Sequence, residues 1–348
     1  MPNRFPLSLV AAALVGLACV AQRAPVLVPA RPTRPLTPRK IEERDELGLT
    51  DADFARPAPL VKRGPGLRAE AGRELCARSA DTPEWRVSES AHYFFVVCGR
   101  DAVFARRLAE HAEAARALVR SFFPHPELDP VPIDCAPCVV RCAKDRDQFC
   151  SYGGPPGGRG YWNPLARELV VHGEHSDRDA TTWHALQGLV FHAYMSEVFG
   201  TCALAPWFAA GNAEFFAGFD VTRTERADGP IELVPAPNAT ARETWRARDA
   251  QGELPPLKEL LHAERFELDR YVGSMIQSWA LVQHLREIER ATPEHPHARI
   301  LARWLAAWLE DGDAQRATEH AFAGVDLDAL ERDVRSSCSA LGRAGDRR

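Results

Sequence analysis

The sequence predicts an α+β fold, with a small mixed sheet and its helices first and a mainly helical part after it. The chain of 348 residues is 45% hydrophobic and 26% charged, which is ordinary for a globular protein. Segments rich in β-branched and aromatic residues lie between residues 85 and 172, whereas helical spacing of apolar residues dominates after residue 181. Strands that precede the helices, instead of alternating with them, favour the α+β class.

The strands are expected in three segments. Trp85 to Cys98 (WRVSESAHYFFVVC) is rich in aromatic and β-branched residues and predicts one or two strands. Residues 138–142 (CVVRC) predict another short strand, followed by a short helical piece. Tyr161 to His172 predicts a hairpin with a turn at Asn163-Pro164 and a second strand at Glu168 to His172.

The helices follow from spacing and from end signals. Apolar residues recur at helical spacing after Asp101 and reach Phe123, where Pro124 ends the helix. A long helix is expected from about Thr181 to Phe199, and a second begins at Pro206, because proline suits the first turn. A short β-like segment (231–234) precedes further helices around 256–262, 270–290, 298–310, 313–322 and 327–342.

The amino terminus predicts export. Arg4 precedes the apolar run Leu7–Val20, which has the length of a signal-peptide core and is shorter than the ~20 residues that span a bilayer. We interpret residues 1–22 as a signal peptide. The segment before Cys19 resembles the bacterial lipoprotein box, which would make Cys19 a lipidation site, and simple secretion after Ala18 or Ala21 is the alternative. Residues 23–66 are proline-rich and predict an extended tether, so that residues 67–348 form the folded domain.

The cysteines of an exported chain predict disulfides. The sequence has nine cysteines, and eight remain when Cys19 is set aside, an even number. They are Cys76, Cys98, Cys135, Cys138, Cys142, Cys150, Cys202 and Cys338. The four between residues 135 and 150 are close enough in sequence to ligate one zinc ion or an iron-sulfur centre, and unpaired thiols are a third interpretation.

Composition and missing motifs exclude several functions. The 43 Lys+Arg and 48 Asp+Glu leave no basic surplus, so we expect no nucleic-acid partner. The glycine-rich loop 153–158 has no following Lys-Ser/Thr and is not a phosphate loop. Ser274 lacks the G-x-S-x-G context of a hydrolase nucleophile.

Two helical segments carry a recognisable pattern. The first reads His184-Ala185-Leu186-Gln187-Gly188, and the second reads PWFAAGNAEFF from Pro206 to Phe216. Together with the Gly-Tyr-Trp-Asn-Pro turn and a late QSWALV segment from Gln277, they resemble the peptidase MA-like domain of exported bacterial proteins, over roughly residues 85–342. This domain is related to the gluzincin metallopeptidases, whose first helix bears HExxH and whose second bears a third zinc ligand, so the resemblance implies a zincin-like fold.

The resemblance also implies that the zinc chemistry is lost. Gly188 occupies the position of the second histidine of HExxH, Ala210 that of the ligand glutamate, and Ala185 that of the general base. Zinc hydrolysis requires three protein ligands and a base for the bound water. Only His184 remains, so we expect no catalytic residue and no cofactor. Glu214 is expected to cap the helix or form a buried hydrogen bond. Tyr271 is either a remnant of a transition-state-stabilising group or, more simply, a tyrosine on a helix that packs against the sheet.

An alternative is a rebuilt metal site. His172 and His175 lie just before the first motif helix and would meet His184 if their loop folds back over it. His192 cannot share an ion with His184, because eight helical residues span about 12 Å. Solvated loop residues are the simpler interpretation of His172 and His175.

Three functions follow from these alternatives. The first is an exported or lipid-anchored pseudoenzyme of the cell envelope that binds an unidentified peptide or protein by strand addition. The second is an active metal-dependent hydrolase that uses His172, His175 and His184. The third is a purely structural envelope protein. A membrane would be contacted only through the lipid anchor.

Overall fold

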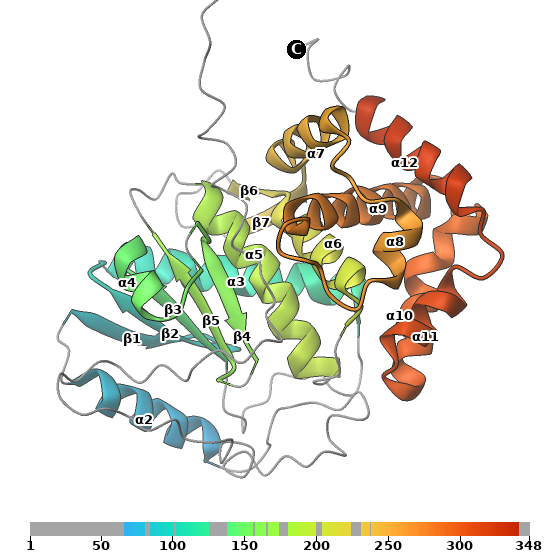
Figure 1. The fold of residues 1–348 in the computed structure, drawn as a ribbon. Helices are drawn as coiled ribbons and strands as arrows, with labels where there is room; N and C mark the ends of the chain where they lie inside the picture. Colours follow the sequence, from blue (N-terminus) through green and yellow to red (C-terminus); the bar gives the residue numbers. More distant parts are fainter. Residues whose placement is uncertain are drawn as a thin grey trace, which may run out of the picture. The chain divides into compact units, whose positions relative to one another are not determined.

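The computed structural model describes ten segments of the chain: residues 66–80, 84–100, 102–124, 138–155, 157–164, 166–173, 180–199, 204–223, 231–236 and 238–340. The expected signal peptide, Cys19, His175 and all of the expected tether except Gly66 lie outside them. The chain divides into two compact units, Met1–Thr201 (unit 1) and Cys202–Arg348 (unit 2). The expected α+β class is confirmed: unit 1 holds a mixed sheet with helices, and unit 2 is mostly helical (Figure 1).

Unit 1 is built on a five-stranded sheet with the order β1-β2-β3-β5-β4. Its strands are β1 (Trp85–Glu89), β2 (Tyr93–Cys98), β3 (Cys138–Ala143), β4 (Gly160–Asn163) and β5 (Glu168–His172). β2, β3 and β5 run parallel, and the edge strands β1 and β4 pair antiparallel with β2 and β5. All six residues of β2 are buried, which explains its continuous apolar sequence YFFVVC. The expected strands and hairpin are therefore confirmed.

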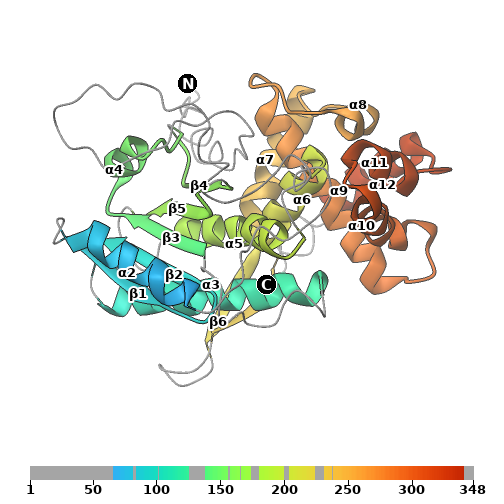
Figure 2. The ribbon, with the colours of Figure 1, turned by 90° about the horizontal axis from the view of Figure 1, so that it is seen from below.

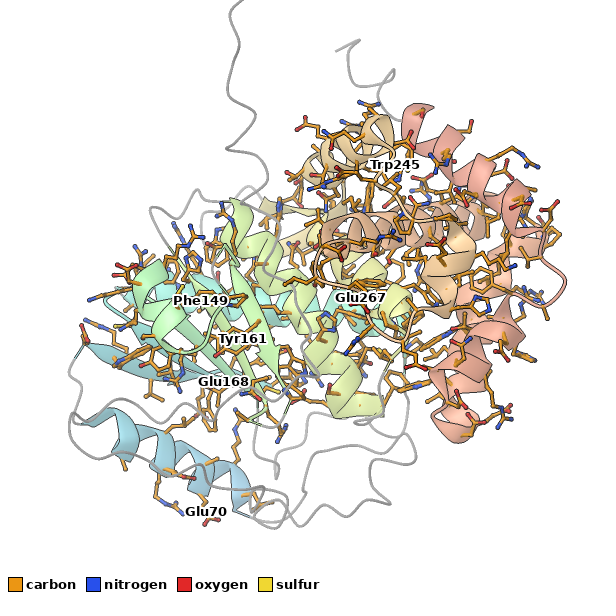
Figure 3. All side chains as sticks on the ribbon, in the orientation of Figure 1. Glu70, Phe149, Tyr161, Glu168, Trp245 and Glu267 are labelled. Atoms are coloured by element: carbon orange, nitrogen blue, oxygen red, sulfur yellow. The ribbon has the colours of Figure 1, made fainter. Side chains whose placement is uncertain are left out.

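Helices lie on both faces of this sheet (Figures 1 and 2). They are α2 (Leu67–Ala80), α3 (Ala102–Phe122), α4 (Arg146–Ser151), α5 (Ala180–Tyr194) and the π-helical turn η3 (Met195–Phe199). α3 and α5 pack together on one face, where Leu189 of α5 lies directly against Gly160. α2 and α4 lie on the other face: Gly72 of α2 approaches Phe94, and Phe149 of α4 contacts Tyr161 (5.8 Å between ring centroids; Figure 3).

Unit 2 is organised around two helices in close contact. Its elements are α6 (Pro206–Ala217), β6 (Phe219–Arg223), β7 (Ile231–Pro235), α7 (Ala239–Gln251), α8 (Leu257–His262), α9 (Tyr271–Ala291), η4 (Pro296–Arg299), α10 (Ile300–Asp311), α11 (Ala314–Ala321) and α12 (Leu327–Ala340). Gly211 permits the close approach of α6 to α9, since a Cβ there would lie 2.5 Å from the carbonyl oxygen of Ser278. Leu330, Val334 and Cys338 are buried on α12, as their spacing predicts.

Three elements are not anticipated by the sequence patterns. α2 and α7 contain few large apolar residues; on α7 only Ala241 and Trp245 are buried. β6 pairs with the expected β7 segment. The expected helix to Phe199 is α-helical only as far as Tyr194, after which η3 begins. Among the described helices, none combines the length and apolar character that crossing a membrane requires.

No disulfide links the cysteines that the structure describes. Free thiols are found at Cys76, Cys98, Cys138, Cys142, Cys150 and Cys338. Burial raises the pKa of Cys142 to about 12, which keeps that thiol protonated and unreactive. Cys135 and Cys202 lie outside the described residues, so pairing that involves them stays a prediction.

Candidate functional site

Helix α5 carries the first motif in a mostly buried setting. Thr182 fixes its first turn by donating a hydrogen bond to the carbonyl oxygen of His172 (3.0 Å). Ala185 and Gly188 are buried, and His184 is half-buried. Neither residue 185 nor residue 188 has a side chain that could act as a base or a ligand. On this helix His184 is therefore the only member of the expected zinc-site pair.

Helix α6 carries the second motif. Ala210 is half-buried, and the neighbouring Asn212 is fully buried and donates to the carbonyl oxygen of Phe208 (2.8 Å). The indole of Trp207 donates to the hydroxyl of Thr318 (3.1 Å). The aromatic residues of the motif thus serve the core of unit 2, and the position of the expected third ligand offers only a methyl group.

His172 is not a solvated loop residue, and that interpretation is wrong. It is the last residue of β5 and is 3% exposed. Its ring lies 4.8 Å from that of Phe149, and its Nε2 lies 3.0 Å from the carbonyl oxygen of Gly158. His172 therefore packs the glycine-rich loop against the end of β5.

No metal site can be assembled from the residues that the structure describes. Within them, no group of three or more His, Cys, Asp or Glu side chains is arranged to hold an ion. The expected contribution of His175 lies outside these residues. The described chain thus offers no set of ligands around His184.

A buried cluster of charged side chains among the described residues of unit 1 is centred on Glu197. This carboxylate, 7% exposed, accepts hydrogen bonds from Arg116 (2.6 Å) and Arg167 (2.8 Å). Burial by itself would raise the pKa of Glu197, but the two guanidinium groups outweigh it and lower that pKa. The thiol of Cys138 also hydrogen-bonds to the carboxylate. The cluster joins η3, α3, β3 and the β4–β5 turn.

Backbone geometry supports a structural role for the Glu197 cluster. Arg167 has φ of 51°, the only positive value among the described residues other than glycine. Such a conformation is uncommon for a side chain of this size and persists where surrounding contacts fix it. The guanidinium of Arg116 also lies 5.0 Å from the ring centroid of Tyr194, in the last turn of α5. These contacts hold the end of α5 in place.

Glu214 on α6 differs from its expected role. It is 3% exposed, does not cap the helix, and its Oε1 has no hydrogen-bond partner among the described residues. Burial raises the pKa of Glu214 to about 7. A carboxyl group in this setting is partly protonated at neutral pH.

The late motif segment in α9 also supports the core of unit 2. Gln277 is fully buried and accepts a hydrogen bond from the indole of Trp245 (2.9 Å), which Figure 3 labels on α7. Tyr271 is the first residue of α9, and its ring lies edge-on to that of Phe266 (6.2 Å). The described part of unit 2 contains only the β6–β7 pair as a sheet, so the five-stranded sheet that Tyr271 was expected to contact belongs to the other unit.

His192 is a buried titratable group of α5. It lies in the last turn of the helix, and its ring is 5.4 Å from that of Phe191. Burial lowers the pKa of His192 to about 4, so the imidazole is neutral at pH 7. This residue, like Glu197, belongs to the packing of unit 1.

β4 is an edge strand, so the backbone groups on its side away from β5 pair with no described strand. The amide of His172 donates to the carbonyl oxygen of Arg159 (3.4 Å), so that pair is hydrogen-bonded. Bonded pairs alternate in an antiparallel ladder, and Tyr161 and Asn163 therefore also bond to β5. The amide and carbonyl groups of Gly160 and Trp162 point away from β5, on the side where no described strand pairs with β4.

Comparison of the sequence with models of known protein families and with curated proteins gives no match.

Proposed function

We propose that this protein is an exported, zincin-like pseudoenzyme that binds an extended segment of a peptide or protein without hydrolysing it by a zinc mechanism. The missing zinc ligands support the absence of zinc-dependent hydrolysis. Gly188 and Ala210 cannot bind a metal through their side chains, and Ala185 cannot act as a base. The motif helices instead use their polar and aromatic residues for packing. A peptidase-like domain that has lost its zinc chemistry can still bind a peptide, and this is the function that we propose.

The observation that carries the proposal is the backbone of Gly160 and Trp162, which faces away from β5 although both residues are themselves buried. An extended peptide placed beside β4 would exchange hydrogen bonds with both residues and would continue the sheet. Side chains in such a strand alternate between the two faces of the sheet. Those on one face would lie beside Tyr161, which is half-buried, and those on the other beside Trp162, which is buried.

Amide hydrogen exchange of the intact chain tests this binding mode. We would titrate the protein with extended ten-residue peptides and follow single amides by NMR. Exchange at Gly160 and Trp162 should slow by at least about tenfold in the complex, since each amide gains a hydrogen bond. The amide of Tyr161 serves as the internal control, because it is already bonded to β5.

The peptide offers a matched second test. N-methylation of the peptide amides that face β4 should weaken binding by about tenfold or more, whereas methylation of the alternate amides should leave it nearly unchanged. Equal loss for both sets, or binding with no change at Gly160 and Trp162, would refute strand addition at β4.

Export and lipidation are part of the same proposal. The charged start, the apolar run and Cys19 support a signal peptide that ends at a lipidated cysteine. Mass spectrometry of the mature amino terminus would find a diacylglyceryl group on Cys19 if the anchor exists. A mature chain that begins after Ala18 or Ala21 without added lipid would show simple secretion.

A further inference from the structure

Unit 2 contains a cluster of three histidines that the proposed function does not use. His284 of α9 contacts the hydroxyl of Ser337 on α12 through its Nδ1 (2.8 Å). The rings of His295 and His297, at the start of η4, lie 4.8 Å apart. All three imidazoles are within electrostatic reach of one another, and Asp333, one turn before Ser337 on α12, acts on His284 and His297. This group of five residues is called the histidine cluster below.

The hydrogen bonds of the histidine cluster favour neutral imidazoles. Nδ1 of His295 accepts a hydrogen bond from the backbone amide of His297 (3.2 Å), which a protonated Nδ1 could not do. Nε2 of His284 and Nδ1 of His297 are buried and have no partner among the described residues. A proton on either nitrogen would be a buried donor without an acceptor.

Most of the groups around the histidine cluster also oppose protonation, and Asp333 favours it. Arg303 of α10 is the permanent cation that faces His297, and Asp333 is the one carboxylate among the groups that act on both His284 and His297. Burial and the neighbouring imidazoles lower the pKa of His284, and Asp333 opposes this shift. At neutral pH Asp333 gives the cluster one negative charge, and Arg303 places one positive charge beside it. Full protonation would add three positive charges.

We propose that the contact between α12 and the α9–η4 region is an acid-sensitive device, in which protonation of the histidine cluster detaches α12 while the α6–α9 core of unit 2 stays folded. At this contact α12 packs against the part of unit 2 that carries the histidines, α9 and the start of η4. His284 is neutral when it contacts Ser337, and protonation ends that state. The three positively charged imidazoles then repel one another beneath α12.

The remaining anchors of α12 explain why this helix should move first. Its apolar contacts come from the three buried residues Leu330, Val334 and Cys338. On its other sides Arg335 pairs with Asp249 of α7, and Glu331 accepts a hydrogen bond from the backbone amide of Leu257. Arg246 of α7 donates to the carbonyl oxygen of Ser339 (3.4 Å). α6 and α9, by contrast, are in extensive contact, and most side chains of α6 are buried.

Hydrogen exchange of the full chain at pH 7 and pH 5, corrected for the intrinsic rates, tests the device. Amides of α12 should lose protection at pH 5, by about severalfold, because the detached imidazoles bind protons more tightly than the docked ones and acid therefore favours detachment. Amides in the middle of α9 should keep their protection. Equal protection of α12 at both values of pH, or simultaneous opening of α9 and α12, would overturn the proposal.

Variants identify the groups responsible. The double change His284→Asn and His297→Asn removes both titrations and should abolish the response of α12, whereas His320→Asn, on the exposed face of α11, should leave it intact. Asp333→Asn changes an exposed residue and removes the opposing charge, so detachment should begin at a higher pH. An unchanged response in both the double variant and Asp333→Asn would refute the role of the cluster.

Discussion

Two buried glutamates, one in each unit, show how differently the same side chain behaves when its partners change. Glu197 in η3 is held by Arg116 and Arg167, and its pKa is lowered although burial acts to raise it. Glu214 in α6 is buried to a similar degree and has no hydrogen-bond partner for Oε1 among the described residues, and its pKa rises to about 7. Burial alone therefore does not predict the charge of a carboxyl group.

The comparison also separates the two units in their expected response to pH. Unit 1 has its buried carboxylate charged and paired, so its ion cluster should change little between pH 6 and pH 8. Unit 2 has a carboxyl group whose ionisation is opposed by its surroundings in the same range. Neither glutamate occupies the position of a zinc ligand or of the general base in the motif, which is a further reason to regard both as structural.

The largest effect is expected for Glu197→Gln. The change removes the carboxylate that Arg116 and Arg167 share while both guanidinium groups stay buried, and removal of one partner from a buried pair costs about 3–5 kcal/mol in free energy of unfolding. Urea denaturation at pH 7 would measure the loss. Glu110→Gln is the matched control, because the pair of Glu110 with Arg106 is exposed and should contribute about 0.5 kcal/mol or less. Equal losses for the two variants would contradict the comparison.

Glu214 should give the next largest effect through pH. Its pKa is raised in the folded protein from 4.5 to about 7, so the folded state binds the proton more tightly than the unfolded state. The corresponding stability is fully present below pH 4.5 and is lost as the pH rises through 7, by ~3 kcal/mol at most.

The variant Glu214→Gln keeps the shape of the side chain and cannot ionise. Urea denaturation between pH 4.5 and pH 8 should show a smaller decline in stability than in the unchanged protein, with the gain greatest at high pH. Glu232→Gln, at an exposed position of β7, should keep the original decline. If Glu214→Gln declines as steeply as Glu232→Gln does, Glu214 is already ionised in the folded protein.

The smallest effect is expected for His184→Ala. The residue is half-buried on α5, and alanine favours a helix, so the free energy of unfolding should change by less than about 1 kcal/mol. Peptide binding should also be unchanged. Trp183→Ala is the neighbouring control: its ring contacts those of Phe104 (5.7 Å) and His111 (5.1 Å), and its loss should cost roughly 2 kcal/mol or more.

Much of the fold could be predicted because its strongest signals are local. β2 is a run of six apolar residues, and α3 repeats apolar residues on one face. In each case a short stretch of sequence is enough to predict the element. α7 was missed because its contact with the core rests on only two buried residues, Ala241 and Trp245. β6 was missed because a strand of an isolated two-stranded pair forms only together with its partner, here β7, and its own sequence gives little signal.

The buried charges could not be predicted for a related reason. Arg116 and Glu197 are separated by 81 residues, and no local pattern joins them. The one available signal was a glutamate inside an apolar helical segment, HAYMSEVF, where an unpaired charge would be costly. His172 was misjudged because the residues that follow it, Gly173, Glu174 and His175, suggest a loop, whereas its position at the end of β5 decides its burial.

The central claim, peptide binding without zinc-dependent hydrolysis, is tested most directly by following one peptide mixture with the intact protein in the presence of zinc and in the presence of a chelator. Mass spectrometry would report cleavage, and fluorescence anisotropy would report binding. We predict intact peptides and equal affinity in both conditions. Cleavage that requires zinc and disappears in His184→Ala would contradict the account and would restore the metal-dependent hydrolase.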